Sequence, residues 1–365
     1  MHEKQYEVRG DGAGTVLVIG LGSLARKLIA DLCHDGAAAP RIVVVTRSAA
    51  AAEWCAVQSI VSGADVRAET GDALDVAFLS GLLLRWRPRL VIQCASLLSP
   101  YFLAGHPLGE AGARAGFGFQ LPAQLPVALA VMRAVRDTAP ATPVVNCSFP
   151  DAVNAILFQA GLAPLAGIGN AGILHYLIER TLRRRGHRPR IQVYAHHVHA
   201  IAVLKNQDLP ATPAPVVLVD GDRVDWQTVR PRFRRALDGD EINLLTAASA
   251  RAALRALCGA GGTVHVSLPG VQGLPGGVPV VLEGGTVRCS HPDGLNHDEL
   301  AFLLRDWGRA DGIESISAEG VVRFTQRYQD IVAPLSRDLC EPLAPGIARA
   351  RFDVLRTLIE RHSPH

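Results

Sequence analysis

The stretch "TVLVIGLGSLARKLIADL", Thr15 to Leu32, decides the fold. Its first five residues are apolar or β-branched, as in a buried strand, and the apolar residues after Ser23 follow helical spacing. Gly20 and Gly22 lie between the two patterns. Glycine destabilises both strands and helices, because it loses more conformational entropy on folding than other residues. We therefore expect this turn to bring the backbone close to something that it binds.

The segment "GLGSLA" fits the pattern G-x-G-x-x-A between a strand and a helix. In that pattern Gly20 makes the tight turn, Gly22 admits a diphosphate, and Ala25 lets the helix pack closely on the strand. The amides of Ser23 and Leu24, at the helix start, would point at the phosphates. The alternative is an ordinary strand–helix turn of an α/β protein.

The end of the second strand, residues 41–46, indicates which dinucleotide binds. The sequence there reads "VVVTRS", so Thr46, Arg47 and Ser48 stand where an NAD-binding protein carries a carboxylate. A charge-assisted hydrogen bond to a 2′-phosphate is worth ~1.5–3 kcal/mol. This predicts NADP, with NADPH as its reduced form. The alternative is that Arg47 stacks on the adenine and discriminates little.

Strands and helices alternate through the first half of the chain. Apolar, strand-like runs alternate with helical patterns, and Ser48 is a candidate cap for the second helix. We expect strands within 15–20, 41–46, 65–74, 89–96 and 143–148, and helices within 23–36, 48–60, 76–86 and 125–138. This order predicts a doubly wound parallel sheet of the Rossmann type, within residues 1–160.

The pattern changes after residue 160. Residues 171–186, 295–310 and 346–362 have helical spacing. Strand patterns with hairpin-like turns occupy 191–204, 214–226, 263–270 and 279–292, the last turning at Gly284 and Gly285. We expect a mixed α+β substrate domain over residues 161–342. A helix within 343–365 would pack back on the body.

Ligands of open α/β sheets bind beyond the carboxyl ends of the strands. After the fourth strand, Cys94, Ala95 and Ser96 are small enough for a cofactor to pass closely. The Gly- and Pro-rich segment 97–124 follows them. It carries His106, Glu110 and Arg114, and it is either a lid over the substrate or a passive surface or oligomer contact.

Polar residues also follow the fifth strand. Asn146 and Ser148 are candidates to hydrogen-bond the nicotinamide carboxamide or the substrate. Asp151 is a candidate acid–base residue. The alternative is that it only caps the helical run that it precedes.

Histidines are the best candidates for a proton donor, because an unperturbed imidazole has a pKa of ~6.5. In a strand over 191–204, His197 and His199 would share one face, and His175 lies on the preceding helix. His197 is the first choice. A His-x-His pair also suits zinc, but no third ligand is evident, so we expect no metal. The alternative is that these histidines are buried or surface residues that take no part in catalysis.

Composition excludes other classes. With 37 Lys and Arg against 34 Asp and Glu, and 5% aromatics, the chain lacks the basic, aromatic surface of a nucleic-acid-binding protein. No apolar run approaches the ~20 residues of a membrane helix, and the charged start does not resemble a signal peptide. Seven cysteines without a C-x-x-C pair favour a reducing cytoplasm. A small-molecule substrate is expected, and a homodimer is plausible.

These motifs resemble the NAD(P)-binding Rossmann oxidoreductases, with an order of elements similar to lactate and malate dehydrogenases. "SFPDAVNAIL" looks like the turn after the fifth strand, with Phe149 in place of an asparagine, and "VYAHHVH" looks like the strand with the catalytic histidine. His175 and Ile178 stand where that family carries an acid and a carboxylate-binding arginine. The layout also resembles opine and saccharopine dehydrogenases.

The resemblance implies an NADP-dependent oxidoreductase that transfers hydride to or from a C=O or C=N bond. Its substrate would be small, with amino-acid derivatives as candidates. Two other functions stay open. One is a cofactor-assisted enzyme without net redox change, such as an elimination or epimerisation. The other is a sensor or partner protein that binds NADP without catalysis.

Overall fold

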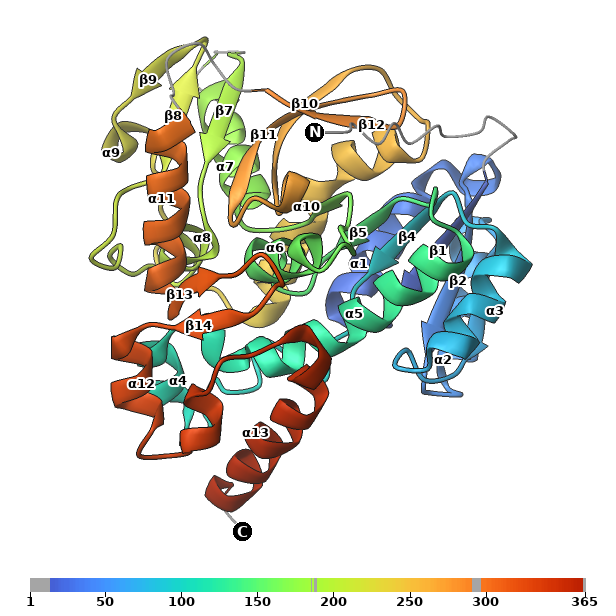
Figure 1. Ribbon diagram of the computed structural model, residues 1–365. Helices are drawn as coiled ribbons and strands as arrows, with labels where there is room; N and C mark the ends of the chain where they lie inside the picture. The colour runs from blue at the N-terminus through green and yellow to red at the C-terminus, as the bar shows by residue number, and fades with distance from the viewer. Residues whose placement is uncertain (1–13, 185, 187–188, 291–296, 364–365) are drawn as a thin grey trace.

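The computed structural model describes residues 14–184, 186, 189–290 and 297–363 (Figure 1). Six parallel strands form the central sheet in the order β3-β2-β1-β4-β5-β6. Their bounds are β1 Thr15–Ile19, β2 Arg41–Thr46, β3 Val66–Thr70, β4 Leu90–Gln93, β5 Val144–Asn146 and β6 Ala166–Gly167. This is the strand order of the Rossmann dinucleotide-binding fold, so the predicted fold class is confirmed. The sixth strand, beyond residue 160, was not predicted.

The two faces of the sheet are covered by different helices, because side chains alternate along each strand. The helices of this half are α1 Ser23–Leu32, α2 Ala51–Ser62, α3 Val76–Trp86, α4 Gly109–Ala115, α5 Leu121–Thr138 and α6 Pro150–Gln159. Leu17 and Ile19 pack with α3, α5 and α6, whereas Val16 and Val18 pack with α1 and with α10, Gly239–Leu257, from the second half of the chain. The expected cap of α2 is wrong: its N-cap is Ala50, and no side chain caps it.

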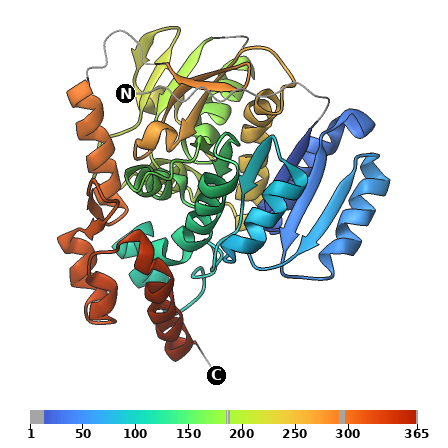
Figure 2. The same ribbon diagram turned by 45° about the vertical axis from the view of Figure 1, so that its right-hand side comes forward.

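The second half contains antiparallel sheets. Figure 2 shows the parallel sheet on one side of the molecule and these strands on the other. The sheets are β7-β8-β9, β10-β11-β12 and β13-β14. Their strands are β7 Ile191–Tyr194, β8 Val216–Val219, β9 Asp222–Val224, β10 Val264–Pro269, β11 Gly277–Glu283, β12 Thr286–Cys289, β13 Ile313–Ile316 and β14 Val322–Phe324. Both predicted hairpins, β8–β9 and β11–β12, are present.

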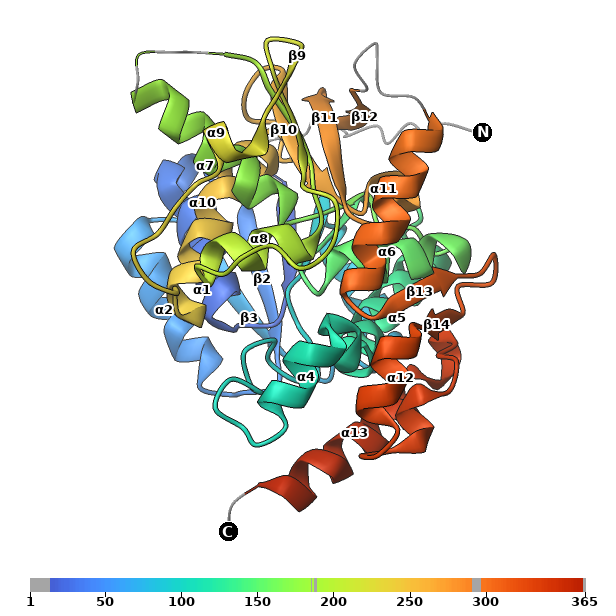
Figure 3. The same ribbon diagram turned by 90° about the vertical axis from the view of Figure 1, so that its left-hand side faces the viewer.

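The helices of the second half attach it to the parallel sheet. They are α7 Ala171–Arg184, α8 His197–Leu204, α9 Trp226–Val229, α10 Gly239–Leu257, α11 His297–Ala310, α12 Gln326–Val332 and α13 Ala348–His362. Helix α10, which was not predicted, packs along α1 (Figure 3), and α13 packs on α5. Among the described residues no single helix is long and apolar enough to span a membrane. The pair of α4 and Phe117–Thr138 passes that test only jointly, across a 117° bend.

The prediction of one strand over 191–204 is wrong. Strand β7 ends at Tyr194, and α8 begins at His197. The backbone N–H of His196 donates to the Nδ1 atom of His199 at 3.0 Å, and His199 N–H bonds back to the backbone oxygen of His196 at 3.0 Å. This local bonding starts a helix, so the histidines do not alternate between two faces as strand residues would.

Candidate active site

The glycine turn, residues 20–25, has the geometry that a bound diphosphate needs. Gly20 has φ +96°, and a Cβ there would lie 3.0 Å from the Cβ atom of Ala95, so both its conformation and its space favour glycine. A Cβ on Gly22 would meet no atom within 4 Å, so the backbone there faces open space. Ala25 is fully buried. The turn therefore fits a dinucleotide.

The turn opens into a cleft of about 1270 Å³ between the parallel sheet and the second half of the chain. Most of the predicted cofactor residues line it. They are Gly20, Gly22, Ser23, Leu24, Ala25, Thr46, Arg47, Ser48, Cys94, Ala95, Ser96 and Ser148. Of the four predicted catalytic residues, only His197 lines this cleft. We call the part near the glycine turn the cofactor end and the part near His197 the histidine end.

Arg47 lies at the cofactor end, where β2 stops. Its side chain is exposed, and no carboxylate of the described residues forms an ion pair with it. Thr46 Oγ1 accepts a hydrogen bond from the backbone N–H of Ser48 at 3.2 Å, which shapes the turn. The guanidinium is thus available to an anion. Asp72, after β3, also lines the cleft.

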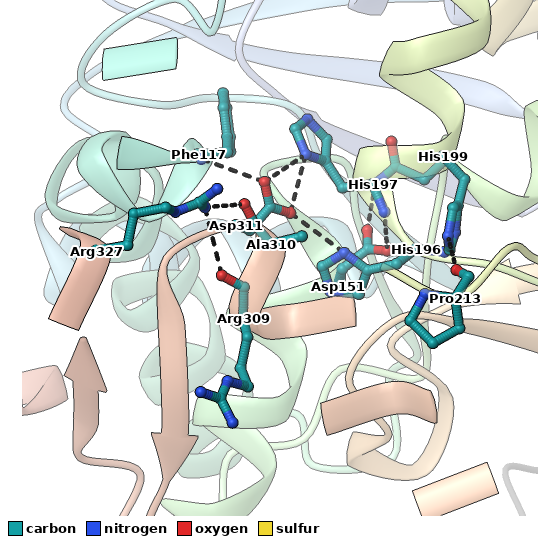
Figure 4. Close-up of polar contacts among 11 residues, drawn as sticks. Phe117, Asp151, His196, His197, His199, Pro213, Arg309, Ala310, Asp311 and Arg327 are labelled. Carbon is teal, nitrogen blue, oxygen red and sulfur yellow. Dashed lines mark hydrogen bonds and ion pairs between the residues drawn. The ribbon is translucent and has the colours of Figure 1, made fainter. Parts of the chain in front are cut away.

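At the other end of the cleft, the half-buried His197 pairs with the buried carboxylate of Asp311 (Figure 4). Its Nδ1 atom lies 3.1 Å from both carboxylate oxygens of Asp311. The Nδ1 atom of His196 lies 3.2 Å from Oδ2 of the same carboxylate. Asp311 is only 3% exposed, so these contacts are made with little water around them. Low dielectric surroundings strengthen the attraction between the imidazole and the carboxylate.

The pair shifts the pKa of both partners. Burial lowers the pKa of His197, but the Asp311 charge and hydrogen bond outweigh burial, so the pKa is raised above its usual value. Burial favours the neutral form of Asp311, but the two histidines outweigh it and hold the pKa of that carboxyl below its usual range. The arrangement therefore favours a charged pair, with a proton held on His197.

Asp311 is held by the turn between α4 and the short 3-10 helix Phe117–Gln120. The backbone N–H of Phe117 donates to Asp311 Oδ1 at 3.2 Å, and the N–H of Gly118 donates to the Asp311 carbonyl at 2.8 Å. A Cβ on Gly116 would lie 2.4 Å from the Asp311 carbonyl carbon, and one on Gly118 would lie 2.7 Å from its oxygen. The sequence G-F-G thus permits this close approach.

Two aromatic rings flank the imidazole. The ring centroid of Phe117 lies 4.6 Å from that of His197, and the centroid of Phe149 lies 5.4 Å from it, edge-on. Phe149 has φ +42°, a left-handed conformation that non-glycine residues seldom adopt. The two rings pack edge-to-face on each other at 4.7 Å. They restrict the orientation of the imidazole.

Asp151 lies behind His197 and does not line the cleft. Its side chain is fully buried, and Oδ1 accepts the backbone N–H of His197 at 3.0 Å. Asn170 donates to the other oxygen. The first N–H groups of a helix lack partners within the helix, and Asp151 supplies one to α8. Asp151 does not cap α6, whose N-cap is Phe149, and it does not line the cleft. Its position therefore matches neither the predicted acid–base role nor the predicted capping role.

The polar residues after β5 form a network under the cleft. Asn146 is buried and donates to Asn154 Oδ1 at 2.8 Å and to the Ser148 carbonyl at 3.0 Å. Asn146 does not line the cleft, and its predicted hydrogen bond to the nicotinamide or the substrate stays a prediction. Ser148 lines the cleft, and its hydroxyl donates to Gln124 Oε1 at 2.7 Å.

The other two candidate histidines lie away from the cleft. His175 packs in the second half with Nδ1 3.1 Å from Ser267 Oγ, and burial lowers its pKa to about 4. His199 is fully buried with Nε2 3.0 Å from the Pro213 carbonyl, and burial lowers its pKa to about 3. Both are therefore neutral at pH 7, and neither lines the cleft. The structure does not bring them together with His197.

The segment 97–124 is more ordered than a plain loop. It contains α4, the 3-10 helix and the start of α5. His106 and Glu110 line the cleft and Arg114 does not, and His106 Nε2 lies 3.2 Å from Ser363 Oγ beyond α13. A lid function for this segment stays a prediction. Within the described residues no three His, Cys, Asp or Glu side chains cluster as metal ligands would.

Sequence reasoning missed Asp311 and Phe117. Asp311 stands in "GRADGI", a helix end with no catalytic motif, and it is 114 residues from His197. The only signal for Phe117 was a pair of flanking glycines in a long segment.

Comparison with known proteins gives weak structural likenesses. UDP-glucose 4-epimerase from Bifidobacterium longum, in complex with NAD+ and UDP, is 19% identical over 39% of this chain and 38% of that chain, with a TM-score of 0.29. UDP-glucose-4-epimerase from Stenotrophomonas maltophila, with bound NAD and formylated UDP-arabinopyranose, is 19% identical over 37% and 36%, with a TM-score of 0.28. Lactate dehydrogenase from Cryptosporidium parvum is 15% identical over 82% and 96%, with a TM-score of 0.47.

The chain thus spans little more than a third of the length of the two epimerases and nearly all of the lactate dehydrogenase. No protein-family model matches it, and no curated protein matches its sequence.

Proposed function

We propose that this protein is an NADP-dependent oxidoreductase that transfers hydride between the nicotinamide and a C=O or C=N bond of a small substrate. Carbonyls and imines derived from amino acids are the first candidates. The observation that carries the proposal is that a single cleft has groups suited to bind a dinucleotide at one end and a proton donor at the other. The glycine turn and Arg47 line one end, and the His197–Asp311 pair lines the other.

The cofactor, when bound, supplies or accepts a hydride. The chain would hold its diphosphate at the backbone of residues 20–24 and its 2′-phosphate at Arg47. Ser148 would lie near the nicotinamide. An open position at Gly22 and an exposed, unpaired Arg47 among the described residues support both contacts.

His197 would donate the proton that a reduced carbonyl or imine needs. Its raised pKa keeps more of it protonated near neutral pH. Asp311 would stay ionised and stabilise the imidazolium without taking the proton itself. Phe117 and Phe149 would limit water around the imidazole. In the oxidative direction His197 would accept the proton instead, so the same pair serves both directions.

The cleft is open, which supports an enzyme over a sensor that binds NADP without catalysis. A cleft filled by apolar side chains would have favoured the sensor. A non-redox reaction would use the same residues. It would differ in leaving the amount of reduced cofactor unchanged while product accumulates.

The test is calorimetric titration of the protein with NADPH and NADH, followed by an assay of NADPH oxidation. The substrates would be a panel of oxo acids, imines and amine–carbonyl pairs. We expect tighter binding of NADPH and oxidation with at least one class of substrate. His197→Asn serves as the matched control that binds the cofactor but does not turn over. No heat with either dinucleotide would reject the proposal.

A further inference from the structure

Helices α1 and α10 lie side by side, and both start at the cleft (Figure 3). Residue numbers rise along both helices from one ion pair to the next, so the helices run in the same direction. Two pairs join the helices, Lys27 with Asp240 and Asp31 with Arg251. A third pair joins Arg255 of α10 to Asp35 in the 3-10 helix Cys33–Ala38, which follows α1 directly. Two helix N-termini, each with a partial positive charge, therefore lie close together at the cofactor end.

The pair nearest the cleft differs from the other two. Its carboxylate belongs to α10 and lines the cleft beside Ser23. Asp240 Oδ1 accepts hydrogen bonds from Ser23 Oγ and from Lys27 Nζ, each at 2.6 Å. These hydrogen bonds hold the pKa of Asp240 below its usual value, and the bond from Lys27 contributes more than the bond from Ser23. A carboxylate thus already accepts hydrogen bonds from the side chains of Ser23 and Lys27 near the start of α1.

The same donors lie where a diphosphate would bind. Ser23 follows Gly22, where the cleft is open to the backbone. Phosphate oxygens accept hydrogen bonds from hydroxyl and ammonium groups as a carboxylate does. A diphosphate at this turn would compete for Ser23 and Lys27, and its charge would repel Asp240.

We propose that the Asp240 carboxylate occupies the position of a phosphate oxygen and is displaced when a diphosphate binds. The second half of the chain therefore contributes a residue to the cofactor site, and that residue weakens binding. The inference rests on the proposed cofactor function, because it assigns the diphosphate to this turn.

The test compares Asp240→Asn with Asp31→Asn. The first removes the competing charge, and the second removes a carboxylate from the same helix contact, remote from the cleft. The capping pair Asp238 and Glu241 still caps α10 in Asp240→Asn, so the helix end is kept. Calorimetry with NADPH, ADP-ribose, adenosine and inorganic pyrophosphate measures the dissociation constants at low and high salt.

We expect Asp240→Asn to bind NADPH, ADP-ribose and pyrophosphate about tenfold more tightly at low salt, with a smaller gain at high salt. Adenosine, which has no diphosphate, should bind both proteins equally. Lys27→Met should weaken the diphosphate ligands. Unchanged dissociation constants in Asp240→Asn, or an equal gain in Asp31→Asn, would overturn the inference.

The pyrophosphate titration separates this inference from the proposed function. Tighter pyrophosphate binding without any dinucleotide binding would support an anion site that Asp240 occupies, while rejecting the oxidoreductase. Dinucleotide binding that Asp240→Asn leaves unchanged would reject the inference alone.

Discussion

The two ends of the cleft are built in different ways. At the cofactor end, residues 20–25 and 46–48 belong to two consecutive strand–helix units, and their shape follows from local backbone geometry. At the histidine end, Phe117, His197 and Asp311 come from three distant parts of the chain. The first end is fixed by a short motif, and the second exists only when the whole chain has folded.

This difference separates the kinds of damage that substitutions should cause. A change at the cofactor end should alter binding of the dinucleotide and leave the proton donor intact. A change at the histidine end should alter turnover and its pH dependence and leave dinucleotide binding intact. The substitutions below test this separation, from the largest expected effect to the smallest.

Replacement of His197 by Asn should have the largest effect. Loss of a general acid costs about 10²–10⁴ in rate, so we expect kcat to fall at least a hundredfold. The dissociation constant of NADPH should stay within about twofold, because His197 is at the other end of the cleft. Steady-state kinetics and calorimetry measure the two effects. Near-normal turnover would rule out His197 as the donor.

Asp311→Asn should change the pH dependence as well as the rate. In the wild type, kcat for reduction should fall as pH rises through the His197 pKa, which lies above the usual value. Without the Asp311 carboxylate, burial lowers the pKa of His197 and only the charge of Asp151 opposes it. The fall should therefore move to lower pH, and kcat at neutral pH should drop about tenfold for each unit by which the His197 pKa lies below 7.

The pH profile of kcat, recorded for both proteins, tests this prediction. The Asp311→Asn protein should retain NADPH binding, which serves as the control for folding. A profile that stays in place in the variant would show that Asp311 does not act through His197.

Arg47→Ala should affect one dinucleotide more than the other. Loss of a charge-assisted hydrogen bond to the 2′-phosphate costs ~1.5–3 kcal/mol, so NADPH should bind roughly tenfold or more weakly. NADH binding should change little. Equal small losses for both would mean that Arg47 stacks on adenine. Calorimetry with both dinucleotides decides between the two.

The two glycines of the turn should respond differently to alanine. Gly20→Ala places a Cβ against Ala95 at φ +96°, so it should lower the free energy of unfolding by about 1–2 kcal/mol. Gly22→Ala meets no protein atom and should unfold like the wild type. It should still bind NADPH several-fold more weakly, because the methyl group points into the cleft. Urea unfolding and calorimetry distinguish these outcomes.

The sequence predicted the strands and the turn of the cofactor end well because each of these elements is local. The strand–turn–helix of residues 15–32 and the strand 41–46 need no distant residue to be identified. The histidine end was predicted only in His197. Asp311 lies at the end of α11 without a motif, and the helical start at His197 depends on Asp151, 46 residues away, for one hydrogen bond. The spacing of apolar residues along the chain carries no information on contacts between distant residues. Residues 191–204 were therefore predicted to be a strand.

The close fit of Gly116 and Gly118 against Asp311 bears on the order in which the molecule is completed. During synthesis the first five strands of the parallel sheet and the glycine turn are available well before residue 311 is made. Asp311 therefore joins an existing surface at residues 116–118, and no side chain can stand at either glycine when it arrives. A nascent chain could acquire its dinucleotide-binding turn early, whereas the charge that supports His197 is among the last parts to arrive.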